Sequence, residues 1–203
     1  MRLKLTGIGA LAASIALVLA ACSSQTEPAR DVATTPTTSA PACVVGEPGP
    51  GGGTIFYRDA ATELCFEAAP SGWNGGGSDP SLAWGTGKCA STSIATVTAI
   101  GKGEANTTAI TSNAACDTAV KAPAAWAAKN YAGGGLSDWF LPSKDELNQL
   151  YAQKATVGGF AVDYYWSSSR NYAGGAWYQS FGNGGQYTDP KSSAYRVRPV
   201  RAF

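Results

Sequence analysis

The first 21 residues constrain the fold most, because they predict an export leader and leave only the rest of the chain to form a domain. Two basic residues, Arg2 and Lys4, precede an apolar run from Leu5 to Ala21. A basic start, a short apolar core and small residues at its end are the three parts of a secretory signal. The run is also short for a spanning helix, which needs about 20 apolar residues. We therefore expect residues 1–21 to be removed after export.

The end of the leader, Leu19-Ala20-Ala21-Cys22, resembles the lipobox of bacterial lipoproteins. The resemblance implies cleavage before Cys22 and diacylation of its thiol. Two acyl chains plus an acylated amino end form a stable anchor, where one chain alone is marginal. The expected location is the extracytoplasmic face of the cell membrane or of an outer membrane, with the lipid bilayer as the partner of Cys22. The alternative is an ordinary signal peptide in which Cys22 is incidental.

Composition then divides the exported part into two segments. Residues 22–42 are rich in Ser, Thr, Pro and Ala and show no hydrophobic periodicity. Such a segment buries too little apolar area to offset its ordering entropy, so we expect a flexible tether. Residues 43–203 have the length of one domain.

Charge and histidine content exclude several classes of function. Without the two basic residues of the leader, 13 basic and 14 acidic residues remain. A nearly neutral domain has no broad attraction for nucleic acid, so we expect no nucleic-acid partner. The chain contains no histidine, which removes the commonest general base and metal ligand. Serine triads and zinc sites that rely on histidine are excluded, and we expect no cofactor.

Four cysteines remain in the domain, at positions 43, 65, 89 and 116. An even number in an exported chain predicts two disulfides, with three possible connectivities. We favour Cys43–Cys65, which would tie the ends of a predicted strand pair, and Cys89–Cys116, which would close the loop region that follows. Each bond would add about 3 kcal/mol of stability in the chain-entropy model.

Short strands and few helices are expected in the domain. Apolar and aromatic runs predict strands at 54–57, 64–68, 164–169, 176–181 and 195–201, the first two as a hairpin. Helices are expected over about 123–131 and after Ser143, with an earlier turn or two near 107–112. Loops are expected at 170–175 and 182–191. This mixture predicts an α+β fold with an antiparallel sheet, about two helices and long loops rich in glycine and aromatic residues.

The helix after Ser143 begins with a capping box, Ser143-Lys144-Asp145-Glu146. The Ser143 hydroxyl can accept from the Glu146 amide while the Glu146 side chain reaches back. Asp138 and Asp145 lie nearby, and paired carboxylates can serve acid–base catalysis. Because the cap already occupies Glu146, we interpret the block as structural. The apolar face that follows consists of Leu147, Leu150 and Tyr151.

Five blocks of the domain carry a family resemblance: Gly52–Tyr57, Gly101–Thr107, Asp138–Leu147, Tyr165–Ser169 and Arg196–Arg201. In this order they resemble the C-terminal domain of the Legionella collagen-like adhesin, a bacterial extracellular module, over nearly all of 43–203. The resemblance implies a fold similar to C-type lectins and to the formylglycine-generating enzyme group. It also implies extracellular binding, with sulfated glycans recognised by the adhesin. This chain has no collagen-like repeat and no evident basic surface run.

Aromatic residues in the loops are the candidates for binding. Trp73 and Trp84 lie in glycine-rich loops, and Tyr172 and Tyr187 lie in the later loops. Exposed aromatic rings stack on sugars, and loops on a rigid scaffold often carry binding. The alternative is that the two tryptophans fold back and fill space under a long loop.

Arg196, Arg198 and Arg201 are candidates for an anion-binding site. The first two would share one face of a strand, because side chains two residues apart point the same way. The alternative is an internal ion-pair network with the carboxylates of the helix-start block, since arginine suits bidentate carboxylate pairing.

No metal site is expected. Oxygen ligands of the type that calcium uses occur without a calcium-loop spacing, at Asn74, Asp79, Asn183 and Asp189.

These patterns predict a lipid-anchored binding or adhesion module and not an enzyme. It would recognise a glycan, an envelope or host polymer, or a protein. One alternative is a structural envelope lipoprotein without a small ligand. A less favoured one is an enzyme of the formylglycine-generating type, which depends on a reactive cysteine pair that we do not find positioned here.

Overall fold

The computed structural model describes residues 43–203. The expected leader, the lipid site at Cys22 and the tether over 22–42 lie outside the described residues. Within 43–203, no helix has the length and apolar character needed to cross a membrane.

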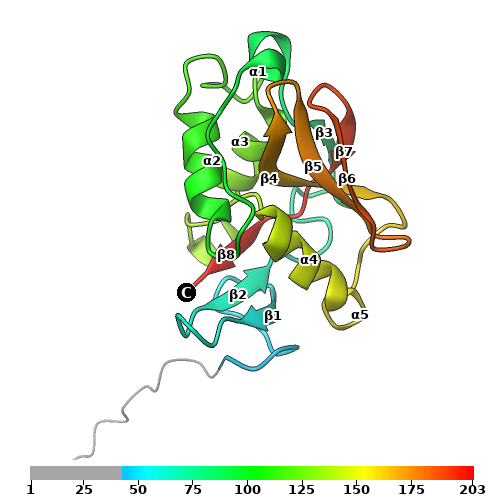
Figure 1. The fold of residues 1–203 in the computed structure, drawn as a ribbon. Coiled ribbons are helices and arrows are strands. Elements are labelled where there is room, and N and C mark those ends of the chain that lie inside the picture. Colours follow the sequence, from blue (N-terminus) through cyan, green and yellow to red (C-terminus); the bar gives the residue numbers. More distant parts are fainter. Residues whose placement is uncertain (1–42) are drawn as a thin grey trace, which may run out of the picture. The chain divides into compact units, whose positions relative to one another are not determined.

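Two β-sheets organise the described residues. A three-stranded sheet has the order β1 (Thr54–Arg58), β2 (Cys65–Ala68) and β8 (Val200–Ala202). A five-stranded sheet has the order β3 (Ser81–Ala83), β7 (Ala194–Arg196), β4 (Tyr164–Tyr172), β5 (Gly175–Ser180) and β6 (Gln186–Pro190). Neighbouring strands run antiparallel except β4 and β7, which are parallel, so the second sheet is mixed and not purely antiparallel. In Figure 1 the hairpin β1–β2 lies at the bottom and the larger sheet on the right.

The described residues contain more helices than the two that were expected. Residues 43–203 contain α1 (Gly87–Ser91), α2 (Gly103–Thr111), α3 (Pro123–Lys129), α4 (Lys144–Ala152) and α5 (Lys154–Val157), with a 3₁₀ turn at Gly133–Gly135. α3 begins at Pro123, where the missing N–H costs nothing in a first turn. α2 and α3 lie together on the side of the molecule away from β5 and β6 (Figure 1). The fold is α+β, as predicted.

The capping box of α4 is present as predicted. The Glu146 amide donates to Ser143 Oγ at 3.2 Å, and the Ser143 amide donates to Glu146 Oε2 at 2.7 Å. Glu146 also accepts from the amides of Lys102, at 3.0 Å, and Gly103, at 3.1 Å. A side chain at Gly103 would meet this carboxylate, because its Cβ would lie 2.3 Å from Glu146 Oε2. Glu146 therefore joins two of the resembling blocks and has a structural role.

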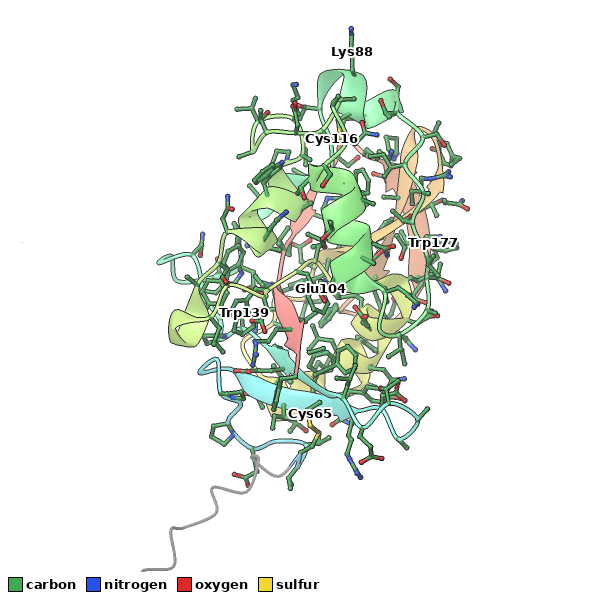
Figure 2. The ribbon with its side chains drawn as sticks, turned by 90° about the vertical axis from the view of Figure 1, so that its left-hand side faces the viewer. Cys65, Lys88, Glu104, Cys116, Trp139 and Trp177 are labelled. Atoms are coloured by element: carbon green, nitrogen blue, oxygen red, sulfur yellow. A yellow bond between two sulfur atoms is a disulfide. The ribbon has the colours of Figure 1, made fainter. Side chains whose placement is uncertain are left out.

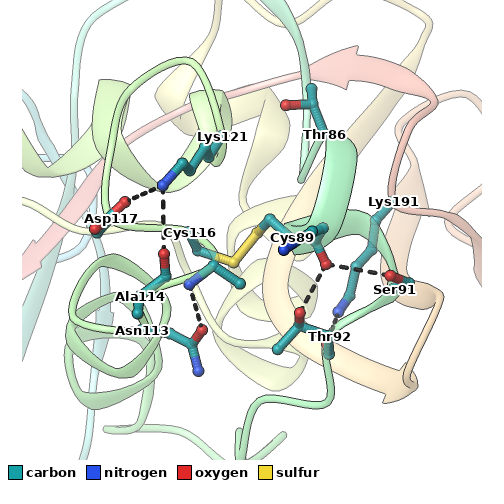
Figure 3. The surroundings of a disulfide bond; sticks show 12 residues. Thr86, Cys89, Ser91, Thr92, Asn113, Ala114, Cys116, Asp117, Lys121 and Lys191 are labelled. Atoms are coloured by element: carbon teal, nitrogen blue, oxygen red, sulfur yellow. Dashed lines mark hydrogen bonds and ion pairs between the residues drawn. A yellow bond between two sulfur atoms is a disulfide. The ribbon is translucent and has the colours of Figure 1, made fainter.

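Both predicted disulfides are confirmed. Cys43–Cys65 ties the start of the described chain to β2, and Cys89–Cys116 joins α1 to the loop after α2, with Cα atoms 5.6 and 5.0 Å apart. They lie toward opposite ends of the domain, as the labelled Cys65 and Cys116 in Figure 2 show. Figure 3 shows the second bond beside the Asp117–Lys121 ion pair.

The strand expected over 195–201 was wrong. β7 ends at Arg196 and β8 begins at Val200, and the two belong to different sheets. Pro199 lacks the N–H that a continuous ladder needs at this point. The chain between them is held by other bonds, from the Val197 amide to the Pro80 carbonyl and from the Ala69 amide to the Pro199 carbonyl.

The two expected loops in the C-terminal third were also too long. β4 extends to Tyr172 and β5 begins at Gly175, which leaves a two-residue turn between them. The segment 182–191 contains β6, which pairs with β5 from Gly175↔Pro190 to Gln179↔Gln186. The glycine-rich start of this segment favours a loop, but pairing with β5 makes the residues after it a strand.

Candidate ligand-binding face

One of the two tryptophans predicted as loop candidates for binding is not accessible. Trp84 is 1% exposed, and its Nε1 donates to the Ser167 carbonyl at 2.9 Å. The ammonium of Lys191 lies 4.5 Å from its ring centroid. The exposed-ring hypothesis was wrong for Trp84, because the glycine-rich loop folds back and places the ring in the core.

Trp73 is half-buried and also held by the interior. Its Nε1 donates to the Val197 carbonyl at 2.9 Å, and its ring packs edge-on against Tyr131 at 5.4 Å between centroids. Both indole N–H groups therefore have partners in the domain, and the alternative of loops folded over the core is the one observed.

The three arginines do not form an anion site. Arg198 is buried and its guanidinium pairs with Asp79, with Nη2 2.7 Å from Oδ2. Arg201 pairs with Asp138 at 2.8 Å and with Glu67 at 3.2 Å. Only Asp138 among these carboxylates belongs to the helix-start block, so the internal network is present with largely different partners.

Arg196 is likewise occupied. Its Nε lies 2.9 Å from Asp163 Oδ2, and its Nη1 donates to the Asp79 carbonyl at 2.6 Å. The premise that Arg196 and Arg198 share a strand was wrong, since the strand ends between them. Asp79 was considered from the sequence only as a possible calcium ligand. In the structure its carboxylate pairs with Arg198 and its carbonyl accepts from Arg196.

Asp79 is nearly inaccessible and is held by two side chains. Besides Arg198, the Tyr165 hydroxyl donates to its Oδ2 at 3.0 Å. Burial raises the pKa of Asp79, while the guanidinium and the phenol oppose that rise. Burial also raises the pKa of Tyr165, and the neighbouring carboxylate adds to the effect. The arrangement is a charge pair inside the protein. The Arg198 guanidinium already donates to Asp79 and to the carbonyls of Ala69 and Gly159, so it does not serve an external anion.

One face of the five-stranded sheet carries a continuous group of tyrosines. Trp166, Tyr178 and Tyr187 are direct partners across β4, β5 and β6. Tyr164 lies two residues before Trp166 and points the same way. Tyr195, from β7, packs on Trp166 at 4.6 Å between ring centroids. We call Tyr164, Tyr178, Tyr187 and Tyr195 the tyrosine face.

The four rings contact one another. Their centroid distances are 5.1 Å for Tyr164–Tyr178, 5.2 Å for Tyr164–Tyr195, 4.7 Å for Tyr178–Tyr195 and 5.8 Å for Tyr178–Tyr187. Tyr164 is 42% and Tyr187 49% exposed, and the other two rings are half-buried over the fully buried Trp166. The result is a firm aromatic surface open to solvent.

A carboxylate borders this face. The Tyr195 hydroxyl donates to Asp189 Oδ2 at 2.8 Å, and Asp189 lies opposite Ala176 in the β5–β6 ladder. Burial raises the pKa of Tyr178, with further contributions from Tyr164 and Asp189. Burial and the Asp189 carboxylate together raise the pKa of Tyr195. Both phenols therefore stay protonated at neutral pH, and the Tyr195 proton is donated to Asp189.

The opposite face of the sheet is covered by α4. The Gln179 amide donates to Asn148 Oδ1 at 2.9 Å, and the Lys144 ammonium lies 4.8 Å from the Trp177 ring centroid. Tyr165 points into the same interior. On the tyrosine side, Trp166 and Ala176 are buried in the core, whereas Tyr164 and Tyr187 remain exposed.

Of the tyrosines named from the sequence, Tyr187 belongs to this face and Tyr172 does not. Tyr172 is 51% exposed at the β4–β5 turn, roughly 25 Å along the strand from Tyr164. Sequence reasoning missed Tyr164, Tyr178 and Tyr195. The signal available for the first was the alternation Tyr164-x-Trp166, and the others required the strand register.

The four oxygen-bearing residues weighed for calcium do not act together. Asp79 is bound to Arg198, and Asp189 accepts from Tyr195. Within 43–203, no three acidic or cysteine side chains gather as a possible metal site.

The chain matches the model of a known domain family. The model of the Lcl C-terminal domain matches residues 77–201, which include all four residues of the tyrosine face. No curated protein matches the chain.

Proposed function

The chain belongs to the family of the Lcl C-terminal domain, and from that membership we propose that it is an extracytoplasmic recognition module for a glycan or other polymer of an envelope or host surface. The domain is of an adhesin-associated kind. The observation that carries the proposal is the tyrosine face, four rings from four strands on the open side of one sheet.

Tyrosine suits such a surface for physical reasons. Each ring offers a large apolar area that stacks on a sugar, and each hydroxyl can exchange hydrogen bonds with sugar hydroxyls. The ring is rigid and loses little conformational entropy on binding. Here the rings also hold one another in place, which lowers the cost of ordering them around a ligand.

The chemistry of the remaining groups favours binding over catalysis. The four cysteines at 43–116 form disulfides, so an enzyme of the formylglycine-generating type would lack its reactive pair here. The buried carboxylates Glu67, Asp79 and Glu146 are held by arginine or backbone N–H groups. A C-type-lectin-like arrangement is part of the proposal, supported by small sheets, flanking helices and disulfide-tied ends. An experimental structure superposed on lectin domains would test it.

Anchoring at Cys22 completes the proposal. The leader and the Ser/Thr/Pro/Ala composition of 22–42 support a lipid-held domain displaced from the bilayer. Expression in a bacterial host with a labelled fatty acid would test this. Incorporation that disappears in Cys22→Ala is expected, and equal labelling of both proteins would overturn the anchor.

The binding role is tested with a glycan panel. The chain from residue 22, carrying Cys22→Ser so that no lipid is attached, is titrated against neutral, amine-bearing and sulfated oligosaccharides. We expect binding by at least one of them, weakened about five-fold in Tyr187→Ala, since a stacked ring contributes on the order of 1 kcal/mol. Tyr172→Ala is the matched control, because its ring is equally exposed and lies away from the face. If the protein binds none of the oligosaccharides, a structural role in the envelope would be the better account.

A further inference from the structure

We propose that the tyrosine face selects glycans with free, protonated amino groups, because the Asp189 carboxylate borders the rings without a cationic partner. This deepens the proposed function and rests on it.

Asp189 is placed to bind a ligand and not only to hold the fold. It lies on β6 opposite Ala176, two residues from Tyr187 and therefore on the same side of the sheet. Its Oδ2 accepts from the Tyr195 hydroxyl at 2.8 Å, and its Oδ1 accepts no hydrogen bond from any residue in 43–203. One oxygen is thus fixed by the protein while the other remains available to a donor from outside.

The cations nearest in sequence do not neutralise this carboxylate. Lys191 is fully buried, donates to the Thr92 carbonyl at 2.8 Å and lies over the Trp84 ring. Arg196, next to Tyr195, is paired with Asp163. Among the described residues Asp189 forms no ion pair, in contrast to Asp79, Asp138 and Asp163, each of which has an arginine partner. The Asp189 carboxylate therefore has no ion-pair partner within 43–203; Arg170, which lies in the same cross-strand row through Ala176, directs its Nε to the Ile94 carbonyl.

The rings add to the same preference. The face of an aromatic ring is the negative end of its quadrupole and attracts an ammonium group within about 6 Å of its centroid. A hexosamine with a free amine could stack its apolar side on Tyr164 or Tyr187 while its ammonium meets Asp189. A sulfated sugar would bring like charge to this carboxylate, and an N-acetylated sugar would keep the stacking but lose the charge.

The experiment uses matched ligands and matched variants. The unlipidated chain from residue 22 is titrated calorimetrically at about pH 6 with a hexamer of glucosamine, a hexamer of N-acetylglucosamine and a heparin-type sulfated chain. We expect the glucosamine hexamer to bind about ten-fold more tightly than its N-acetylated counterpart, the size of one charge-assisted cation–π contact. Asp189→Asn should reduce this ratio to about three-fold, the part that the rings alone supply, while its amide oxygen still accepts from Tyr195 and preserves the fold. Glu104→Gln, an exposed carboxyl group on α2, is the control that should keep the ratio.

Each other outcome overturns the inference in a distinguishable way. Equal binding of both hexamers, or a ratio unchanged by Asp189→Asn, rejects the selection of amines and leaves the glycan-binding proposal intact. Binding of the sulfated chain alone, lost at high salt, also rejects it and moves recognition to a basic surface. Binding of none of the three rejects it, and the wider glycan panel then decides the proposed function separately.

Discussion

The two faces of the five-stranded sheet carry similar aromatic residues and differ in what covers them. Tyr165 and Trp177 point toward α4 and the interior, where hydrogen bonds and cation–π contacts hold the sheet to its neighbours. Tyr164 and Tyr178 point the other way, where they contact further tyrosines and Tyr178 also packs on the buried Trp166. Aromatic content alone therefore does not identify a binding surface, and the covering layer decides between stability and recognition.

The sharpest way to break this comparison is to truncate neighbouring tyrosines on opposite faces. Tyr165→Ala should lower the free energy of unfolding by about 3–5 kcal/mol, since it removes a buried ring and leaves Asp79 short of a donor. Tyr164→Ala, one residue away and 42% exposed, should cost about 1 kcal/mol or less. Guanidinium unfolding with the disulfides intact measures both. Equal losses would mean that the tyrosine face is as important to folding as the covered one.

The covered side depends also on the pair Asp79–Arg198. Arg198→Met should cost about 3–5 kcal/mol at neutral pH, because it leaves a buried carboxylate without its partner. The loss should shrink as the pH falls and Asp79 takes up a proton, since burial raises its pKa. The double variant Asp79→Asn/Arg198→Met is the control and should show little pH dependence. A loss that is constant with pH would contradict this assignment.

Lys191 sharpens the comparison, because it follows the tyrosine-face strand β6 and is fully buried against Trp84. Burial lowers its pKa to about 8, against about 10.4 for a lysine in water. Between these values the unfolded chain binds the extra proton, so the free energy of unfolding should rise with pH by up to about 3 kcal/mol. Unfolding curves at about pH 8 and pH 10 measure the rise, and Lys191→Met should abolish it. Because the fold raises the pKa of several tyrosines, which lowers stability near pH 10, the difference between the two proteins is the test, and an equal pH dependence in Lys191→Met would contradict the burial of this amine.

Local patterns predicted much of the fold, and they failed where tertiary contacts decide. The Ser143–Glu146 cap and the first hairpin were predictable, because a few neighbouring residues determine each of them. The two disulfides followed from cysteine count and the position of the hairpin. β6 was missed because Gly182 to Gly185 favours a loop, and only its pairing with β5 makes the next residues a strand.

The candidate site was less accessible to prediction for the same reason. Trp84 looks exposed in a glycine-rich segment, but Lys191 and the Ser167 carbonyl, about a hundred residues later, hold its ring in the core. The tyrosine face joins four strands. The expected last strand is interrupted between Arg196 and Val200, so that Tyr195 on β7 belongs to the five-stranded sheet while β8 belongs to the other. No single segment contains the information that places these rings together.

The central claim is that the tyrosine face is the binding surface. The most direct test is the affinity of the double variant Tyr164→Ala/Tyr187→Ala for the glycan of the panel that the unmodified protein binds most tightly. We predict a loss of at least about ten-fold, with the free energy of unfolding changed by less than about 2 kcal/mol and with Tyr172→Ala unaffected. Unchanged affinity in the double variant, or an equal loss in Tyr172→Ala, would contradict the account.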